Sequence, residues 1–210
     1  MRKIMFDEHF GLQTAVLRRT KDMTRRIEKV SREMLMYKDS DFRFSPYRDK
    51  MIEVGRYYDG RLQHKMRVYP HFHVGEKVAI AQSYKEILEK EYLPPALEDK
   101  LCERVMNGHI GCTNKMYVES KLMPHYITIT DIKVERMQEI SDGDCLREGI
   151  YERTDVIDSS MNDVKCYSFH GSLHDYRTPR EAFAALIDMI CGKGTWDDNP
   201  WVIAYSFKLD

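Results

Sequence analysis

Three residues in one short polar turn have side chains that suit chemistry: Lys21, Thr24 and Arg26. The surrounding stretch from Arg18 to Lys38 holds eight basic and three acidic residues, an excess of five positive charges, whereas the whole chain has a formal net charge of −1. Such a local concentration of cations suits a negatively charged or phosphate-bearing ligand. Basic residues on an exposed face can also be simply solvated, so charge alone leaves a structural role open.

Thr24 and Lys21 could also act as a nucleophile and its base. A threonine hydroxyl reacts poorly until a base removes its proton. Lys21 could serve as that base if burial, or the neighbouring charges of Arg25 and Arg26, lower its pKa towards neutrality. The alternative is that Lys21 makes a structural ion pair and that Thr24 simply begins a strand.

A helix before this turn and a strand after it must position these side chains. The apolar pattern from Phe10 to Leu17 predicts about two turns of helix. Residues 23–30 are expected to form a strand, which places Thr24 and Arg26 on one face because side chains alternate along a strand. A short helix is expected at 31–38.

The middle of the chain combines strands with a helical segment. The expected elements are a hairpin of residues 51–58 and 61–69, a strand at 76–83, and helices at 84–92 and 96–106. Asp59-Gly60 is the two-residue signal that predicts the hairpin. Pro94-Pro95 separates the two helices, and we interpret residues 84–108 as an insertion between core strands.

The C-terminal third has the clearest local signals. The expected elements are a strand at 126–138, a short helix at 141–148, a long loop over 151–178, a helix from Thr178 to Gly192, and a last strand at 201–209. A slip in the apolar alternation near Asp131 predicts a β-bulge. Ser141 fits a helix N-cap, and Thr178 with Glu181 forms a capping box.

Composition restricts the class of protein. With 210 residues, 42% of them hydrophobic and 32% charged, the chain is expected to be a single globular domain over 1–210. It has no apolar run long enough to cross a membrane and no signal-peptide core, so a cytoplasmic location is expected. The five scattered cysteines form no CxxC pair, so we expect them to be reduced and assign no metal or cofactor.

Strands outnumber helices in the expected core, and most connections look antiparallel. This pattern favours an α+β protein built on a small mixed, mostly antiparallel β-barrel with peripheral helices. Four segments, in order, resemble the ASCH domain family of the PUA-like superfamily, in particular its phage- and bacteroides-type members. These segments are AVLRRTKDMTRR, FHVGEKVAIAQSY, ITDIKVERMQEISDGDCLREGI and PREAFAALIDMICGKGTWDDNPWVIAYSF.

The resemblance implies recognition of RNA or a modified nucleoside in a cleft beside the first helix. Some small ASCH members are amidohydrolases that remove the acetyl group from N-acetylcytidine with a Lys, a Thr and a Glu. Carried over to this chain, the catalytic residues would be Lys21, Thr24 and Glu148. The chain departs from the family at Thr20, where glycine is commonest, and at Gln82, near a position that is acidic in many phage-type relatives.

The preferred interpretation is therefore an RNA- or nucleotide-binding protein, and two alternatives stay open. The first is hydrolysis of an acetylated nucleoside in the same cleft, and the second is a phage accessory or assembly protein that binds another protein of unknown identity. An exposed apolar patch on the insertion would favour this last alternative. The residues expected to contact RNA or nucleotide are Arg25, Arg26, Gln82, Lys193 and Trp196.

Overall fold

The computed structural model describes residues 1–27, 42–47, 51–58, 61–157 and 163–210. At its centre is a five-stranded sheet with the order β1-β6-β7-β10-β2. Its strands are β1 (Lys3–Ile4), β6 (Lys77–Ile80), β7 (Tyr126–Arg136), β10 (Trp201–Leu209) and β2 (Met23–Ile27). β1 pairs with β6 in parallel, and the other neighbours pair antiparallel.

This arrangement confirms a mixed α+β fold with a mostly antiparallel sheet. The sheet ends at β1 on one edge and at β2 on the other, and no closed barrel forms within the described residues. The bulge expected near Asp131 is present, because the register with β10 passes from Asp131 to Ile129 and leaves Thr130 without a partner residue. The first strand ends at Ile27 in the structure, and the rest of its expected range, like the expected helix at 31–38, lies outside the described residues.

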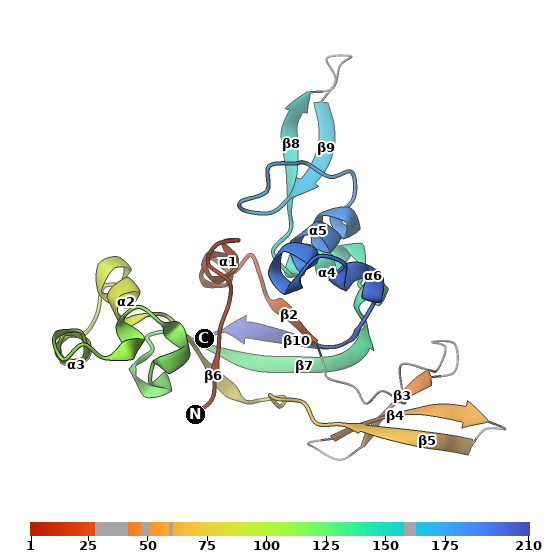
Figure 1. Ribbon diagram of the computed structural model, residues 1–210, viewed down its shortest axis with the longest axis horizontal. Coiled ribbons are helices and arrows are strands. Elements are labelled where there is room, and N and C mark those ends of the chain that lie inside the picture. The colour runs from red at the N-terminus through yellow and green to blue at the C-terminus, as the bar shows by residue number, and fades with distance from the viewer. Residues whose placement is uncertain (28–41, 48–50, 59–60, 158–162) are drawn as a thin grey trace.

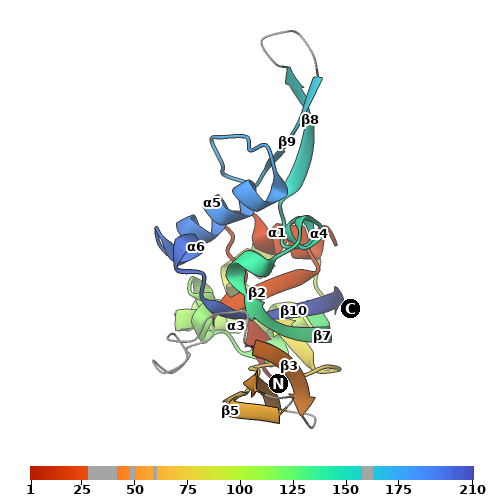
Figure 2. The same ribbon diagram turned by 90° about the vertical axis from the view of Figure 1, so that its right-hand side faces the viewer.

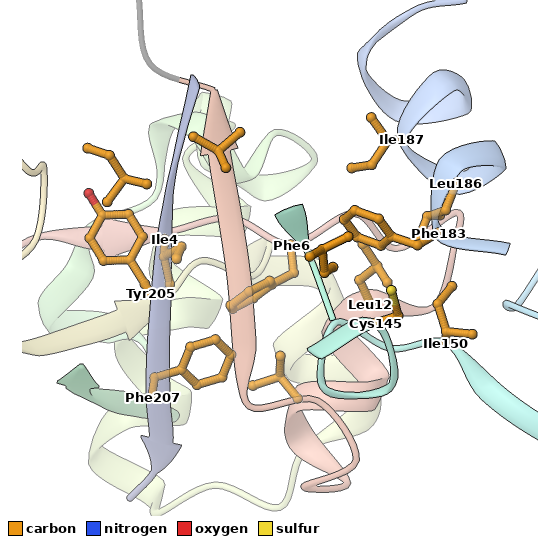
Figure 3. Close-up of a cluster of buried hydrophobic side chains, with 14 of the residues drawn as sticks. Ile4, Phe6, Leu12, Cys145, Ile150, Phe183, Leu186, Ile187, Tyr205 and Phe207 are labelled. Carbon is orange, nitrogen blue, oxygen red and sulfur yellow. The ribbon is translucent and has the colours of Figure 1, made fainter. Parts of the chain in front are cut away.

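Several helices cover one side of this sheet (Figures 1 and 2). They are α1 (Leu12–Leu17), α4 (Asp142–Arg147), α5 (Pro179–Cys191) and α6 (Thr195–Asp198). Ser141 caps α4, and Thr178 and Glu181 form the expected capping box at the start of α5. In Figure 3, Phe183, Leu186 and Ile187 project from α5 towards the sheet and the N-terminal segment that carries Phe6 and Leu12. These side chains belong to the main hydrophobic core.

The helical insertion forms a second hydrophobic cluster beside the sheet. It contains α2 (Tyr84–Lys90) and α3 (Pro95–Met106), as expected, followed by three short 3-10 turns, η3 (Ile110–Cys112), η4 (Lys115–Tyr117) and η5 (Ser120–Leu122). Because β6 and β7 are neighbouring strands, the whole segment between them leaves the sheet and returns to it. Tyr84, Ile87 and Leu101 are fully buried in this cluster.

Two further sheets extend away from the centre (Figure 1). One has the order β3-β4-β5, with β3 (Phe42–Tyr47), β4 (Met51–Tyr58) and β5 (Arg61–Val68), and it contains the expected antiparallel hairpin. The other pairs β8 (Tyr151–Ile157) with β9 (Asp163–Ser168). The expected loop over 151–178 is therefore wrong at 151–157 and 163–168, where these strands lie, whereas residues 169–178 belong to no helix or strand. Tyr151, Glu152 and Thr154 are all exposed, so β8 begins without the apolar alternation that identifies a strand in a sequence.

Candidate functional site

The turn between α1 and β2 brings Lys21 into the protein interior. The backbone N–H groups of Thr20 and Lys21 both donate to the carbonyl of Ala15, at 2.9 and 3.1 Å, which closes the turn after the helix. Arg19 takes the left-handed conformation there, with φ of 61°. The left-handed residue of this turn is thus Arg19, and Thr20, the position at which the sequence resemblance leads us to expect glycine, is not left-handed.

Lys21 is buried against the end of α4, and its ammonium group donates three hydrogen bonds. Its Nζ donates to the carbonyls of Met23 and Glu148 and to Oε2 of Glu148, each at 2.7 Å. Gly149 follows Glu148 with φ of 108°, and a Cβ there would lie 3.1 Å from Leu12 Cδ2, so glycine suits this close packing at the end of α4. Burial lowers the pKa of Lys21, and the charge of Glu148 offsets part of that effect.

Arg25 holds the other side of Glu148. Its Nη1 donates to Oε1 of Glu148 at 3.0 Å, its Nε donates to Glu135 at 2.9 Å, and its Nη2 lies 3.2 Å from Asp144. Burial alone would lower the pKa of Arg25, but the charges of Glu148 and Glu135 raise it above its ordinary value. Arg25 was expected to contact ligand, but its donors are already used to hold these three carboxylates.

A pocket of about 370 Å³ opens over this ion-paired group, and we call it the Lys21 pocket. Its polar lining consists of Asp7, Lys21, Thr24, Arg25, Arg26, Lys115 and Glu148. Its apolar lining includes Phe6, Leu12, Phe183, Leu186, Ile187 and Ile190. Pockets of this size and mixed character are typical of sites for small organic ligands.

The cations of the Lys21 pocket differ in their partners. Lys21 and Arg25 are paired with Glu148, and Lys115 pairs with Glu8 and also donates to the carbonyl of Phe6. Arg26 is exposed and donates to the carbonyl of Met5 at 2.6 Å, and no carboxylate among the described residues lies within ion-pair distance of it. Arg26 is therefore the cation in this pocket that is most available to an anionic ligand.

Thr24 lies in the same pocket but is not joined to Lys21. Its hydroxyl makes no hydrogen bond with any of the described residues, although its side chain is largely buried, and all three Nζ donors of Lys21 are occupied elsewhere. The antiparallel pairing of β2 with β10 fixes the position of Thr24, which lies opposite Tyr205. The nucleophile and base that the sequence suggests are thus brought to one pocket without direct contact.

Three residues expected to bind ligand lie outside the lining of the Lys21 pocket. Gln82 is buried just after β6, where its backbone N–H donates to Met123 Sδ at 3.3 Å. Lys193 is exposed in the turn between α5 and α6. The ring of Trp196 packs edge-on against Phe183 and under the guanidinium of Arg180, so it wedges this turn against the core.

Sequence reasoning missed the apolar walls and Lys115. The spacing of Phe183, Leu186, Ile187 and Ile190 predicted one face of a helix, but gave no sign that this face also borders a pocket. Lys115 comes from a turn after the insertion and carried no recognisable signal. Only the structure shows that these side chains meet the turn that holds Lys21.

No family model matches the chain, and searches of characterised proteins and of solved structures also find no match. Within the part of the chain that the structure describes, no three His, Cys, Asp or Glu side chains are grouped so as to hold a metal ion. None of the described helices has the length and apolar character needed to cross a bilayer.

Proposed function

We propose that this chain is an ASCH-type domain of the PUA-like superfamily that binds a nucleotide or modified nucleoside, free or within RNA, in the Lys21 pocket. The observation that carries the proposal is the arrangement of charge in this pocket. Most of its cations are neutralised by carboxylates, whereas Arg26 has no such partner among the described residues. A ligand with one anionic group and an uncharged planar body suits that arrangement.

The walls of the pocket support the same assignment. Met5, Ile27 and Ile190 are the lining residues that expose apolar surface, whereas Phe6, Phe183 and Leu186 line the pocket but are almost fully buried. A nucleobase can pack against such side chains, while its phosphate pairs with a guanidinium in a charge-assisted hydrogen bond. In this arrangement the base lies near α5, and the phosphate lies at Arg26.

Calorimetric titration with cytidine 5′-monophosphate and with cytidine tests this proposal. Arg26→Gln is expected to weaken the monophosphate about tenfold, equivalent to about 1.4 kcal/mol, and to leave the affinity for cytidine unchanged. Arg177→Gln is a matched control, because Arg177 is an exposed arginine outside the pocket. Equal binding of the monophosphate by both variants would contradict the proposed role of Arg26.

A second candidate function is hydrolysis of an N-acetylated cytidine, and the burial of Lys21 beside Glu148 favours it. The hydroxyl oxygen of Thr24 would bond to the acetyl carbonyl carbon, and its proton would pass through Lys21 to the leaving cytidine amine. Water would then release acetate from Thr24. Lys21 is hydrogen-bonded to Glu148, so it can accept that proton only after it has given one to Glu148.

The measurement for this second candidate is hydrolysis of N-acetylcytidine by the full chain. Turnover in the parent protein should be lost in Thr24→Val and kept in Thr24→Ser, because serine retains the hydroxyl group. Lys21→Met should also abolish turnover, whereas the exposed Lys193→Met should not. A parent protein without turnover would exclude this substrate and leave the pocket as a binding site.

The protein-binding alternative has weaker support. Tyr92 and Met106 are the most exposed large apolar residues of the insertion, at 104% and 86%. They lie at opposite ends of α3, which is about 18 Å long, and residues 98–100 and Glu103 expose charged side chains between them. These two side chains therefore do not form the continuous apolar patch that this function requires.

A further inference from the structure

A second pocket, of about 380 Å³, lies beside α1 and the turn that follows it, and we call it the Arg18 pocket. It shares no lining residue with the Lys21 pocket. Thr20 and Gly149 line the Arg18 pocket, but the residues next to them in the chain, Lys21 and Glu148, are buried. The two pockets are therefore separate, and each has a ligand chemistry of its own.

Two glycines let the segment that carries His170 form one wall of this pocket. A Cβ at Gly11 would lie 2.9 Å from His170 Cβ. A Cβ at Gly171 would lie 3.3 Å from the carbonyl oxygen of His9. Both glycines have positive φ, 63° and 82°, a conformation that other residues adopt only with strain. The wall is therefore held by backbone in close contact with the segment that precedes α1.

The polar side chains of the Arg18 pocket are mostly hydrogen-bond donors. Arg18 is exposed and forms no ion pair with the described residues. Three further exposed side chains in the lining can donate through two hydroxyl groups and an imidazole: Thr14, Tyr151 and His170. The N–H of Arg18 donates to the carbonyl of Thr14 at 2.9 Å, so these two side chains lie one helical turn apart on the same side of α1.

The negative charge in this lining is already neutralised. Glu8 supplies it, and its carboxylate pairs with Lys115 at 2.7 Å. The pocket therefore offers one unpaired guanidinium and several neutral donors, which suits an anion with several acceptor oxygens. A phosphate monoester has three terminal oxygens, and an arginine can bind two of them through parallel hydrogen bonds. A carboxylate has only two oxygens and would leave more of these donors unused.

The size of the Arg18 pocket indicates that a phosphate would not occupy it alone. Its volume of about 380 Å³ lies in the range of sites for small organic ligands, about 300–1,000 Å³. Tyr151 is 45% exposed in the lining, so its ring offers a surface for the organic part of a ligand.

We propose that the Arg18 pocket is a second binding site, for the phosphate monoester of a small organic molecule. The phosphate pairs with the guanidinium of Arg18 and accepts further hydrogen bonds from Thr14 and His170, and the organic part packs against the ring of Tyr151. This site is independent of the proposed nucleotide binding, because the two pockets have no lining residue in common.

Calorimetric titration of the full chain carrying Arg26→Gln tests this proposal, because that background removes the cation proposed to bind phosphate in the Lys21 pocket. The probes are phenyl phosphate, benzoate and inorganic phosphate. Phenyl phosphate should bind about tenfold more tightly than benzoate, which has the same ring and a carboxylate. Addition of Arg18→Gln should weaken phenyl phosphate at least about tenfold, the cost of a lost charge-assisted hydrogen bond. Addition of Arg177→Gln, at an exposed arginine outside both linings, should change nothing.

A second variant tests recognition of the organic part. Tyr151→Ala should reduce the affinity for phenyl phosphate to that for inorganic phosphate and leave inorganic phosphate unaffected. The proposal is overturned if no probe binds, if Arg18→Gln leaves phenyl phosphate unaffected, or if benzoate or inorganic phosphate binds as tightly as phenyl phosphate. Binding of cytidine 5′-monophosphate by the parent chain is measured separately, so a failure of the proposed function would leave this result unchanged.

Discussion

Two carboxylates, Glu148 and Asp188, each accept two hydrogen bonds, but from very different donors. Glu148 accepts from the buried side chains of Lys21 and Arg25 at the base of a pocket. Asp188 accepts from the backbone N–H groups of Gly194 and Trp196 at 3.0 and 2.9 Å, and so fixes the turn between α5 and α6. Residues near both carboxylates were expected to bind ligand. Those near Glu148 line the Lys21 pocket, whereas Lys193 and Trp196, near Asp188, do not.

The physical difference lies in what each carboxylate neutralises. Glu148 compensates two cations that have been removed from water, so its loss leaves buried charge behind. Asp188 satisfies backbone donors that could turn to water if the side chain were removed. A buried ion pair beside a pocket can be tuned for ligand binding or proton transfer, whereas a capped turn mainly contributes local order.

Removal of Glu148 should have the largest effect. Glu148→Leu is expected to lower the free energy of unfolding by about 3–5 kcal/mol, because it leaves Lys21 without its carboxylate. In a Lys21→Met background the same change should cost at least about 1 kcal/mol less, since the unpaired charge is then absent. Urea denaturation of the two single variants and the double variant measures this coupling.

Glu152 provides the matched control for that cycle. Its ion pair with Lys165, 2.7 Å long, is exposed on the β8–β9 hairpin, so Glu152→Leu should cost far less stability than Glu148→Leu. If Glu148→Leu lowers the free energy of unfolding equally in the parent and in Lys21→Met, the two side chains are not energetically coupled. The proposed difference between the buried Glu148 and the turn-capping Asp188 would then be contradicted.

Removal of the Asp188 carboxylate should have a smaller effect. Asp188→Ala is expected to reduce the free energy of unfolding by about 1–2 kcal/mol, the usual cost of a lost helix cap. Affinity for cytidine 5′-monophosphate should stay within twofold of the parent, because Asp188 does not line the Lys21 pocket. A tenfold loss of affinity would show that the turn shapes the ligand site.

Asp188 should also produce a specific dependence of stability on pH. The N–H groups of Trp196 and Gly194 lower the pKa of Asp188 in the folded protein below its ordinary value. Its contribution is therefore complete above the unfolded-state pKa, about 3.9, and is lost as the pH falls through the lower folded-state pKa. The stability difference between the parent and Asp188→Ala should shrink from pH 6 to pH 2, and a constant difference would contradict this account.

The same two regions show how far the sequence leads. Capping signals at Ser141 and Thr178 predicted α4 and α5 because they act within one turn of helix. The pairing of Lys21 with Glu148 joins residues 127 positions apart, and no local spacing encodes it. Glu148 was nominated through the family resemblance alone. The hairpin at β8 was missed because backbone pairing of an exposed, polar strand leaves no apolar alternation.

Substitution of Lys193 should have the smallest effect on stability and affinity, and it tests whether the ligand site extends beyond the Lys21 pocket. It is exposed between Gly192 and Gly194 in the turn that Asp188 fixes, outside the lining of the Lys21 pocket. Lys193→Ala should change the free energy of unfolding by less than about 0.5 kcal/mol and the affinity for cytidine 5′-monophosphate by less than twofold. Arg26→Gln, which removes the same charge at the pocket, should weaken that affinity about tenfold. Equal losses in the two variants would mean that the phosphate is attracted by the general positive field of this face, and not by a contact at Arg26.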